Sequence, residues 1–135
     1  MSKFEQLQTE ICSPHLLGEA LSIIGHAPEV HPGGVTIKDY DGNAYPQPVE
    51  VVVRKTGSFL SDFGFAKGAD GRLALVVDDL DRQYQLGPQW MGRLLQTCKE
   101  QETIATAKAR GYVFRGREVT QTAAGPQVRL QFVAR

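Results

Sequence analysis

Two stretches of the chain place apolar residues at helical spacing. In Pro14–Gly25 leucine, alanine and isoleucine recur every three or four positions, Ser13 can cap the first turn, and Gly25 can end the helix. A longer stretch, Gln89–Arg110, carries an apolar stripe and is followed by Gly111. The sequence therefore predicts two helices, of which the second is the longer.

Short runs between these stretches have the composition of strands. The runs are bounded by glycine and proline, and Asp41-Gly42 and Asp70-Gly71 are typical of tight turns. In Val49–Arg54 the alternation of residues predicts a strand with one face on a core. Gly64, between two phenylalanines, indicates a bulge or a close approach of two backbones. The predicted strands are Val35–Asp39, Val49–Arg54, Phe59–Ala66 and Leu73–Val77.

The last third of the chain predicts a hairpin with a turn at Ala124-Gly125. In its first strand Tyr112 and Phe114 are expected on the face opposite Arg115 and Arg117. In its second strand Val128, Leu130 and Phe132 are expected opposite Arg129 and Gln131.

Strands that are grouped together, and do not alternate with helices, favour an α+β fold. We predict a single domain, 1–135, with an antiparallel sheet and two helices packed on one face. The expected order is helix, three to four strands, long helix, C-terminal hairpin.

The composition of the chain limits the class of protein to which it can belong. Hydrophobic residues make up 41% and charged residues 22% of the chain, close to globular averages. No apolar run reaches the ~20 residues of a spanning helix, and the first residues lack the apolar region of a signal peptide. Two cysteines are too few for a disulfide framework. We therefore expect a cytoplasmic protein with no membrane contact.

The charges balance, with 15 basic and 15 acidic residues. A global attraction to phosphate is therefore not expected, and nucleic acid is an unlikely partner. Locally, Lys99–Arg135 is rich in arginine and lysine, whereas Asp70–Asp81 is acidic.

Two groups of polar residues are candidate metal sites. Cys12, His15, His26 and His31 have side chains that bind zinc, although a partly buried cysteine with surface imidazoles explains them more simply. Asp78, Asp79 and Asp81, with Asp62 and Glu50, offer oxygen ligands or an acid/base pair, although solvated caps are the commoner role. No cofactor is expected.

Two further groups are candidate partner-binding residues. Tyr84 and Trp90 bracket the start of the long helix and offer large aromatic contacts, or else pack the helix entry against the sheet. Arg115, Arg117 and Arg129, with Arg135, are expected on the outer face of the hairpin, where they suit an acidic partner or RNA. No aromatic residue is expected on that face, which disfavours stacking of single strands.

Motifs for hydrolase, nucleotide and dinucleotide chemistry are absent from the sequence. The leading hypothesis is therefore a non-enzymatic protein-binding or adaptor module with an unknown oligomeric state. A small metal-dependent or ligand-binding enzyme and an RNA-binding module using the C-terminal arginines are the alternatives.

Several short motifs spread over nearly the whole chain carry a family resemblance. They are Met1-Ser2-Lys3-Phe4, Ala20-Leu21 with Ile24-Gly25, Tyr40-Asp41-Gly42, Glu50–Val53, Asp62–Phe65, Leu75–Leu80 and Gly111-Tyr112. With these motifs the chain resembles the hypothetical chloroplast reading frame thirty-five family, a domain of unknown function. It departs from the plastid pattern at Cys98, Lys99 and Glu100 and in a longer Pro/Gly loop. The resemblance implies an accessory role beside an AAA-type ATPase, and it transfers no functional residue.

Overall fold

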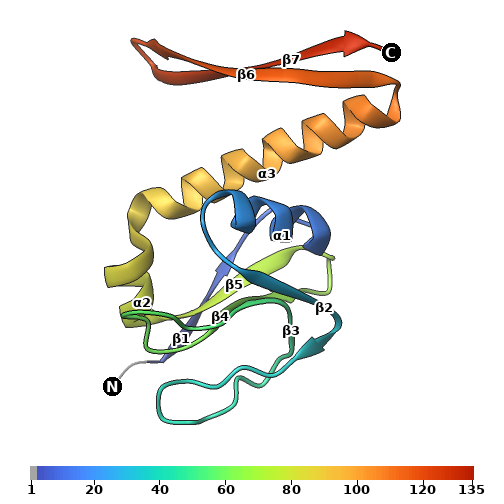
Figure 1. Ribbon diagram of the computed structural model, residues 1–135. Helices are drawn as coiled ribbons and strands as arrows, with labels where there is room; N and C mark the ends of the chain where they lie inside the picture. Colours follow the sequence, from blue (N-terminus) through green and yellow to red (C-terminus); the bar gives the residue numbers. More distant parts are fainter. Residues whose placement is uncertain (1–2) are drawn as a thin grey trace. The chain divides into compact units, whose positions relative to one another are not determined.

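The computed structural model describes residues 3–135, so Met1 and Ser2 of the opening motif lie outside the described residues. It confirms the predicted α+β class, with a five-stranded antiparallel sheet, two main helices and a separate C-terminal hairpin (Figure 1). The chain divides into two compact units, Met1–Cys98 and Lys99–Arg135. A single domain over 1–135 stays a prediction.

The first unit contains the larger sheet, whose strand order is β1-β5-β4-β3-β2. The strands are β1 (Phe4–Gln8), β2 (Pro28–Val35), β3 (Val49–Val53), β4 (Phe63–Lys67) and β5 (Leu73–Asp78). The helical elements are α1 (Pro14–Ile23), α2 (Asp79–Asp81), the π-helical turn η1 (Arg82–Leu86) and α3 (Gly87–Ala109). All strand pairs are antiparallel.

Both faces of the larger sheet are covered, by different parts of the first unit. Leu17 and Leu21 of α1 and Leu94 of α3 pack with one face, as predicted for two helices on one side. Ile37, from the segment between β2 and β3, packs on the other face with Val52 and its neighbours. Four of the five residues of β3 are therefore buried, and the predicted half-exposed strand is wrong here because both faces of β3 are covered.

The N-terminal half of the sheet differs from the predicted order. Phe4–Gln8 forms an edge strand ahead of the first helix, paired with β5, and was not predicted. The predicted strand Val35–Asp39 is displaced, since β2 ends at Val35. The register of β2 shifts between Val30 and Val35, where Gly34 has a φ of 79° and a side chain would meet Pro48.

The second unit consists of the end of α3 and the hairpin β6 (Tyr112–Thr122) and β7 (Gly125–Ala134). The predicted hairpin and its turn are confirmed, with Thr122 paired to Gly125. A backbone hydrogen bond closes the other end of the hairpin, where the Arg135 N–H donates to the Gly111 carbonyl at 2.9 Å.

Candidate binding surface

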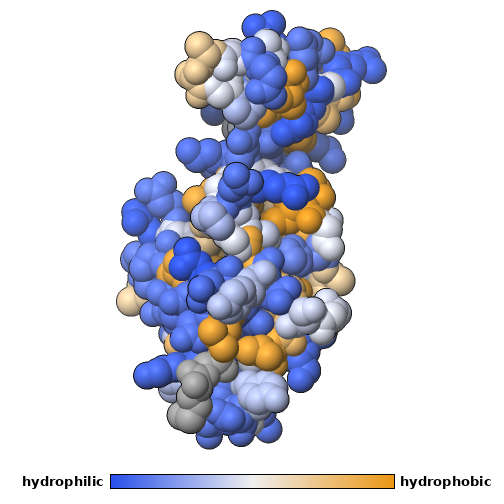
Figure 2. All heavy atoms as spheres, turned by 90° about the vertical axis from the view of Figure 1, so that its left-hand side faces the viewer, coloured by the Kyte–Doolittle hydropathy of each residue, from blue (hydrophilic) through white to orange (hydrophobic). Residues whose placement is uncertain are grey.

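One face of the hairpin is apolar. Directly paired residues of two antiparallel strands lie on the same face, and the pairs Tyr112 with Ala134, Phe114 with Phe132, and Val119 with Val128 all fall on one side. We call this side the apolar hairpin face and define it by Tyr112, Phe114, Val119, Val128, Leu130 and Phe132. In Figure 2 hydrophobic residues show among hydrophilic ones at the surface of the hairpin, at the top of the view.

The apolar hairpin face is not buried by its own unit. Every buried apolar residue of the described chain lies between Ile11 and Cys98, and no residue of Lys99–Arg135 is buried. Tyr112 is 46% exposed, Phe114 39% and Val119 46%. An isolated two-stranded hairpin is marginally stable in water and needs further packing. These side chains are therefore available to a partner.

A groove of about 410 Å³ lies beside this face within the second unit. Tyr112 and Phe132 of the hairpin line one part of it, and the rest comes from Glu102, Thr103, Thr106, Ala107 and Arg110 at the end of α3. We call it the helix–hairpin groove. Its volume is in the range of about 300 to 1,000 Å³ found for ligand sites. It can therefore take one or two apolar side chains of a bound segment.

A bulge in β6 corrects the predicted faces of the hairpin. The register shifts between Phe114 and Gly116, so that Arg117 pairs with Leu130 and lies on the apolar side. There its guanidinium binds the Glu100 carboxylate through two hydrogen bonds, which raise the pKa of Arg117. The prediction that Arg117 lies opposite the aromatic residues is wrong, because the bulge adds one residue.

The second unit is basic. Lys99–Arg135 has seven basic and three acidic residues, a formal charge of +4, while the first unit has eight basic and twelve acidic residues, or −4. Among residues 3–135, Arg110, Arg115 and Arg129 make no ion pair with a carboxylate, in contrast to Arg117. Arg110 lines the helix–hairpin groove beside Tyr112 and Phe132, whereas Arg129 pairs in the strand register with Glu118 and lies on the face opposite the apolar hairpin face.

The aromatic residues proposed near the start of α3 have separate environments. Trp90 is half-buried, contacts the ring of Phe63, and donates its indole N–H to Nε2 of His26 at 3.0 Å. Burial, with a smaller contribution from the charge of Arg93, lowers the pKa of His26. Tyr84 is 71% exposed. Trp90 thus contributes to the packing of the first unit, and Tyr84 contributes a surface ring.

The structure does not bring the four proposed zinc ligands together. Cys12 is exposed, and His15 binds Glu19 at 3.2 Å. His26 accepts a hydrogen bond from the indole N–H of Trp90. His31 binds Glu29 at 2.9 Å. Over the described part of the chain, no three His, Cys, Asp or Glu side chains are placed to hold a metal ion. This arrangement gives a zinc site no support.

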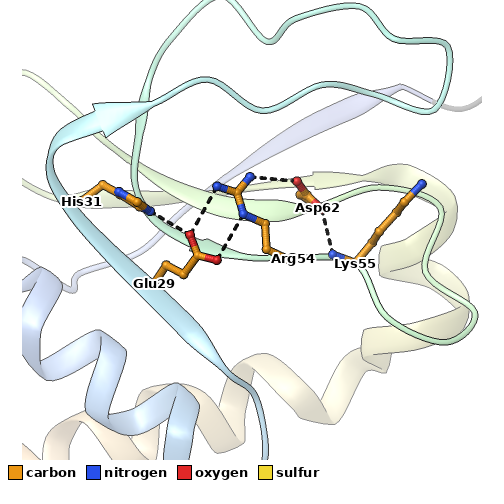
Figure 3. A network of polar contacts seen from close by, with 5 residues as sticks. All are labelled: Glu29, His31, Arg54, Lys55 and Asp62. Atoms are coloured by element: carbon orange, nitrogen blue, oxygen red, sulfur yellow. Dashed lines mark hydrogen bonds and ion pairs between the residues drawn. The ribbon is translucent and has the colours of Figure 1, made fainter.

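His31 belongs instead to a polar network on the first unit (Figure 3). Glu29 lies between His31 and Arg54, and hydrogen bonds from these two residues lower the pKa of Glu29. Arg54 also binds Asp62 at 3.2 Å, and the same carboxylate accepts the Lys55 N–H at 2.7 Å. The network joins β2 to the ends of β3 and β4. It is exposed, so its contribution to stability is small.

The acidic residues are divided between structural roles. Asp78 caps α2 by accepting the backbone N–H groups of Leu80 and Asp81. The Asp81 carboxylate accepts the N–H groups of Leu60 and Ser61 at 2.8 and 3.1 Å. Burial raises the pKa of Asp81 in spite of these bonds. Asp81 thereby holds a loop where the sequence predicted the start of a strand, and β4 begins only at residue 63.

Asp79, Asp62 and Glu50 do not join Asp78 and Asp81 in one site. Asp79 contacts the Lys3 N–H at 3.2 Å, and Asp62 is bound in the network of Figure 3. Asp78 and Glu50 each keep one buried carboxylate oxygen without a partner among the described residues. Asp78 and Asp81 therefore serve a helix cap and a loop, and these five carboxylates do not form a common site.

Comparisons of the chain with protein families, with curated proteins and with solved structures gave no match. Among the described residues, no helix has the length and apolar character that crossing a membrane requires.

Proposed function

We propose that the chain is a protein-binding module whose binding surface is the apolar hairpin face. The observation that carries the proposal is that a regular hairpin with exposed aromatic and β-branched side chains belongs to a unit without a buried residue. Clustered exposed apolar side chains mark interaction sites. Aromatic residues give large contact area at such sites.

The partner that fits this surface is an acidic protein. The +4 formal charge of Lys99–Arg135 would attract it, and the guanidinium of Arg110, beside Tyr112 and Phe132, would pair with one of its carboxylates. The resemblance to the chloroplast reading frame family favours a component of an AAA-type ATPase system. That identity is part of the proposal and rests on the resemblance alone.

Site-specific photocrosslinking tests the proposal, with a matched pair of positions. Val119 lies on the apolar hairpin face and the next residue, Thr120, on the opposite face. With p-benzoylphenylalanine at position 119 we expect a discrete crosslinked protein in the host cell, and with the same group at 120 none. Val119→Asp should release that protein, whereas Thr120→Asp should retain it.

Equal crosslinking from both positions, or retention of the partner by Val119→Asp, would contradict the proposal. Both residues are exposed, so neither substitution removes core packing. A loss of binding therefore reports on the surface and not on unfolding.

RNA binding is a second candidate, and the bulge in β6 is the observation that favours it. The bulge places Arg117 on the same side as Tyr112 and Phe114, a combination of cation and aromatic rings used for stacked bases. Two facts favour protein over RNA: Arg117 is neutralised by Glu100, and Glu102 lines the groove. An affinity for oligouridylate that falls steeply with salt would support the RNA candidate.

A further inference from the structure

The helix–hairpin groove combines an apolar wall with the guanidinium of Arg110. Tyr112, Phe132 and Ala107 supply apolar surface. The Thr103 hydroxyl donates to the Lys99 carbonyl at 2.9 Å, so its hydrogen bond is made within the helix. Arg110 lines the groove and pairs with no carboxylate among residues 3–135. An apolar group with a neighbouring carboxylate is the ligand chemistry that matches this lining.

The length of the groove also limits the ligand. Glu102 and Arg110 both line it, and eight residues along a helix span about 12 Å. An extended peptide covers that distance with about four residues at 3.3 Å each. Because Glu102 repels a second carboxylate at its end, the negative charge of the ligand belongs at the Arg110 end.

We infer that the helix–hairpin groove binds a short peptide segment that places an apolar side chain against Tyr112 and Phe132 and a carboxylate on Arg110. This inference rests on the proposed function and names the partner's contact segment. The charge of the second unit supports an acidic segment over a basic one, and over a second copy of this unit, whose charge is also +4.

The test uses the full chain and a fluorescent peptide of about ten residues, enough to cover the groove with flanking residues on both sides. The peptide has leucines separated by glutamates and serines, and its analogue has lysine in place of every glutamate. We expect saturable binding of the acidic peptide by anisotropy and none of the lysine analogue.

Two variants with the same change of charge distinguish binding in the groove from general electrostatic attraction to the basic second unit. Arg110→Gln should weaken binding about tenfold, the effect of one charge-assisted hydrogen bond. Lys108→Gln removes a charge close by, outside the groove lining, and should weaken binding less than about twofold because exposed charges are screened. Ala107→Trp, which fills the groove, should abolish binding.

Several outcomes would overturn the inference. They are equal binding of the lysine analogue, equal effects of Arg110→Gln and Lys108→Gln, undiminished binding by Ala107→Trp, or no binding of the acidic peptide. Tighter binding of oligouridylate, or a concentration-dependent dimer that the peptide leaves intact, would also overturn it. If crosslinking from Val119 persists in any of these cases, the proposed function stands and only the groove inference fails.

Discussion

Gly64 offers a direct test of the packing in the first unit. A Cβ built at this position would lie 2.7 Å from the Val51 carbonyl oxygen and 2.9 Å from Cγ2 of Val49. Both atoms belong to β3, the adjacent strand, and the oxygen is backbone that cannot rotate away. Glycine at 64 is therefore required by the close approach of β3 and β4, one of the two roles predicted from the sequence.

Gly64→Ala should lower the free energy of unfolding by about 1 to 3 kcal/mol, the usual range for overpacking a core. With a urea m-value of about 1 to 3 kcal/mol/M, a loss of about 2 kcal/mol lowers the midpoint by roughly 1 M. Urea unfolding followed by tryptophan fluorescence measures this change. Trp90 is the one tryptophan of the chain and contacts Phe63, next to residue 64.

Gly92→Ala is the matched control. Gly92 lies in α3, its φ is not positive, and a Cβ there would meet nothing within 4 Å. The same substitution should therefore raise stability by roughly 0.5 to 1 kcal/mol, because alanine is the better helix former. A Gly64→Ala protein as stable as the wild type would refute the close approach of β3 and β4.

Two further variants test polar contacts of the first unit. The folded pKa of His26 lies below its ordinary value of 6.5. The unfolded chain therefore takes up the proton first, and stability should be complete above about pH 6.5 and fall as the pH drops below it. Urea midpoints at several pH values should show a smaller loss in acid for His26→Gln than for the wild type. Asp81→Ala leaves the N–H groups of Leu60 and Ser61 without their acceptor, and should lower stability by about 2 to 3 kcal/mol. A smaller effect than that of Asp78→Ala at the α2 cap would argue against this role of Asp81.

The sequence predicts those parts of the fold in which local pattern and burial agree. The stripe of Leu17 and Leu21 and the run Leu73–Val77 lead to α1 and β5 close to their predicted bounds. The edge strand β1 escaped prediction because five residues with two glutamines and a glutamate have weak strand propensity. The position of β1 is set by its pairing with β5, a long-range contact that no local sequence pattern predicts.

The candidate site was only partly predictable for a related reason. Charge points to Arg115 and Arg129, but the alternation of apolar residues in a strand does not tell an exposed apolar face from one that packs on a core. The bulge at Phe114 and Gly116 decides the face of Arg117. Gly116 inside a strand was the available signal, since glycine in strands often marks a bulge.

The core and the proposed binding surface lie in different units, and this separates stability from binding. Gly64→Ala acts on the buried strands of the first unit, and Val119→Asp acts on an exposed residue of the second. If the second unit gains its packing from a partner, binding should protect the β6 and β7 amides from hydrogen exchange and leave those of β4 and β5 unchanged. Equal protection of both units by the acidic peptide would mean that the ligand contacts the first unit too, and the binding surface would then extend beyond the hairpin.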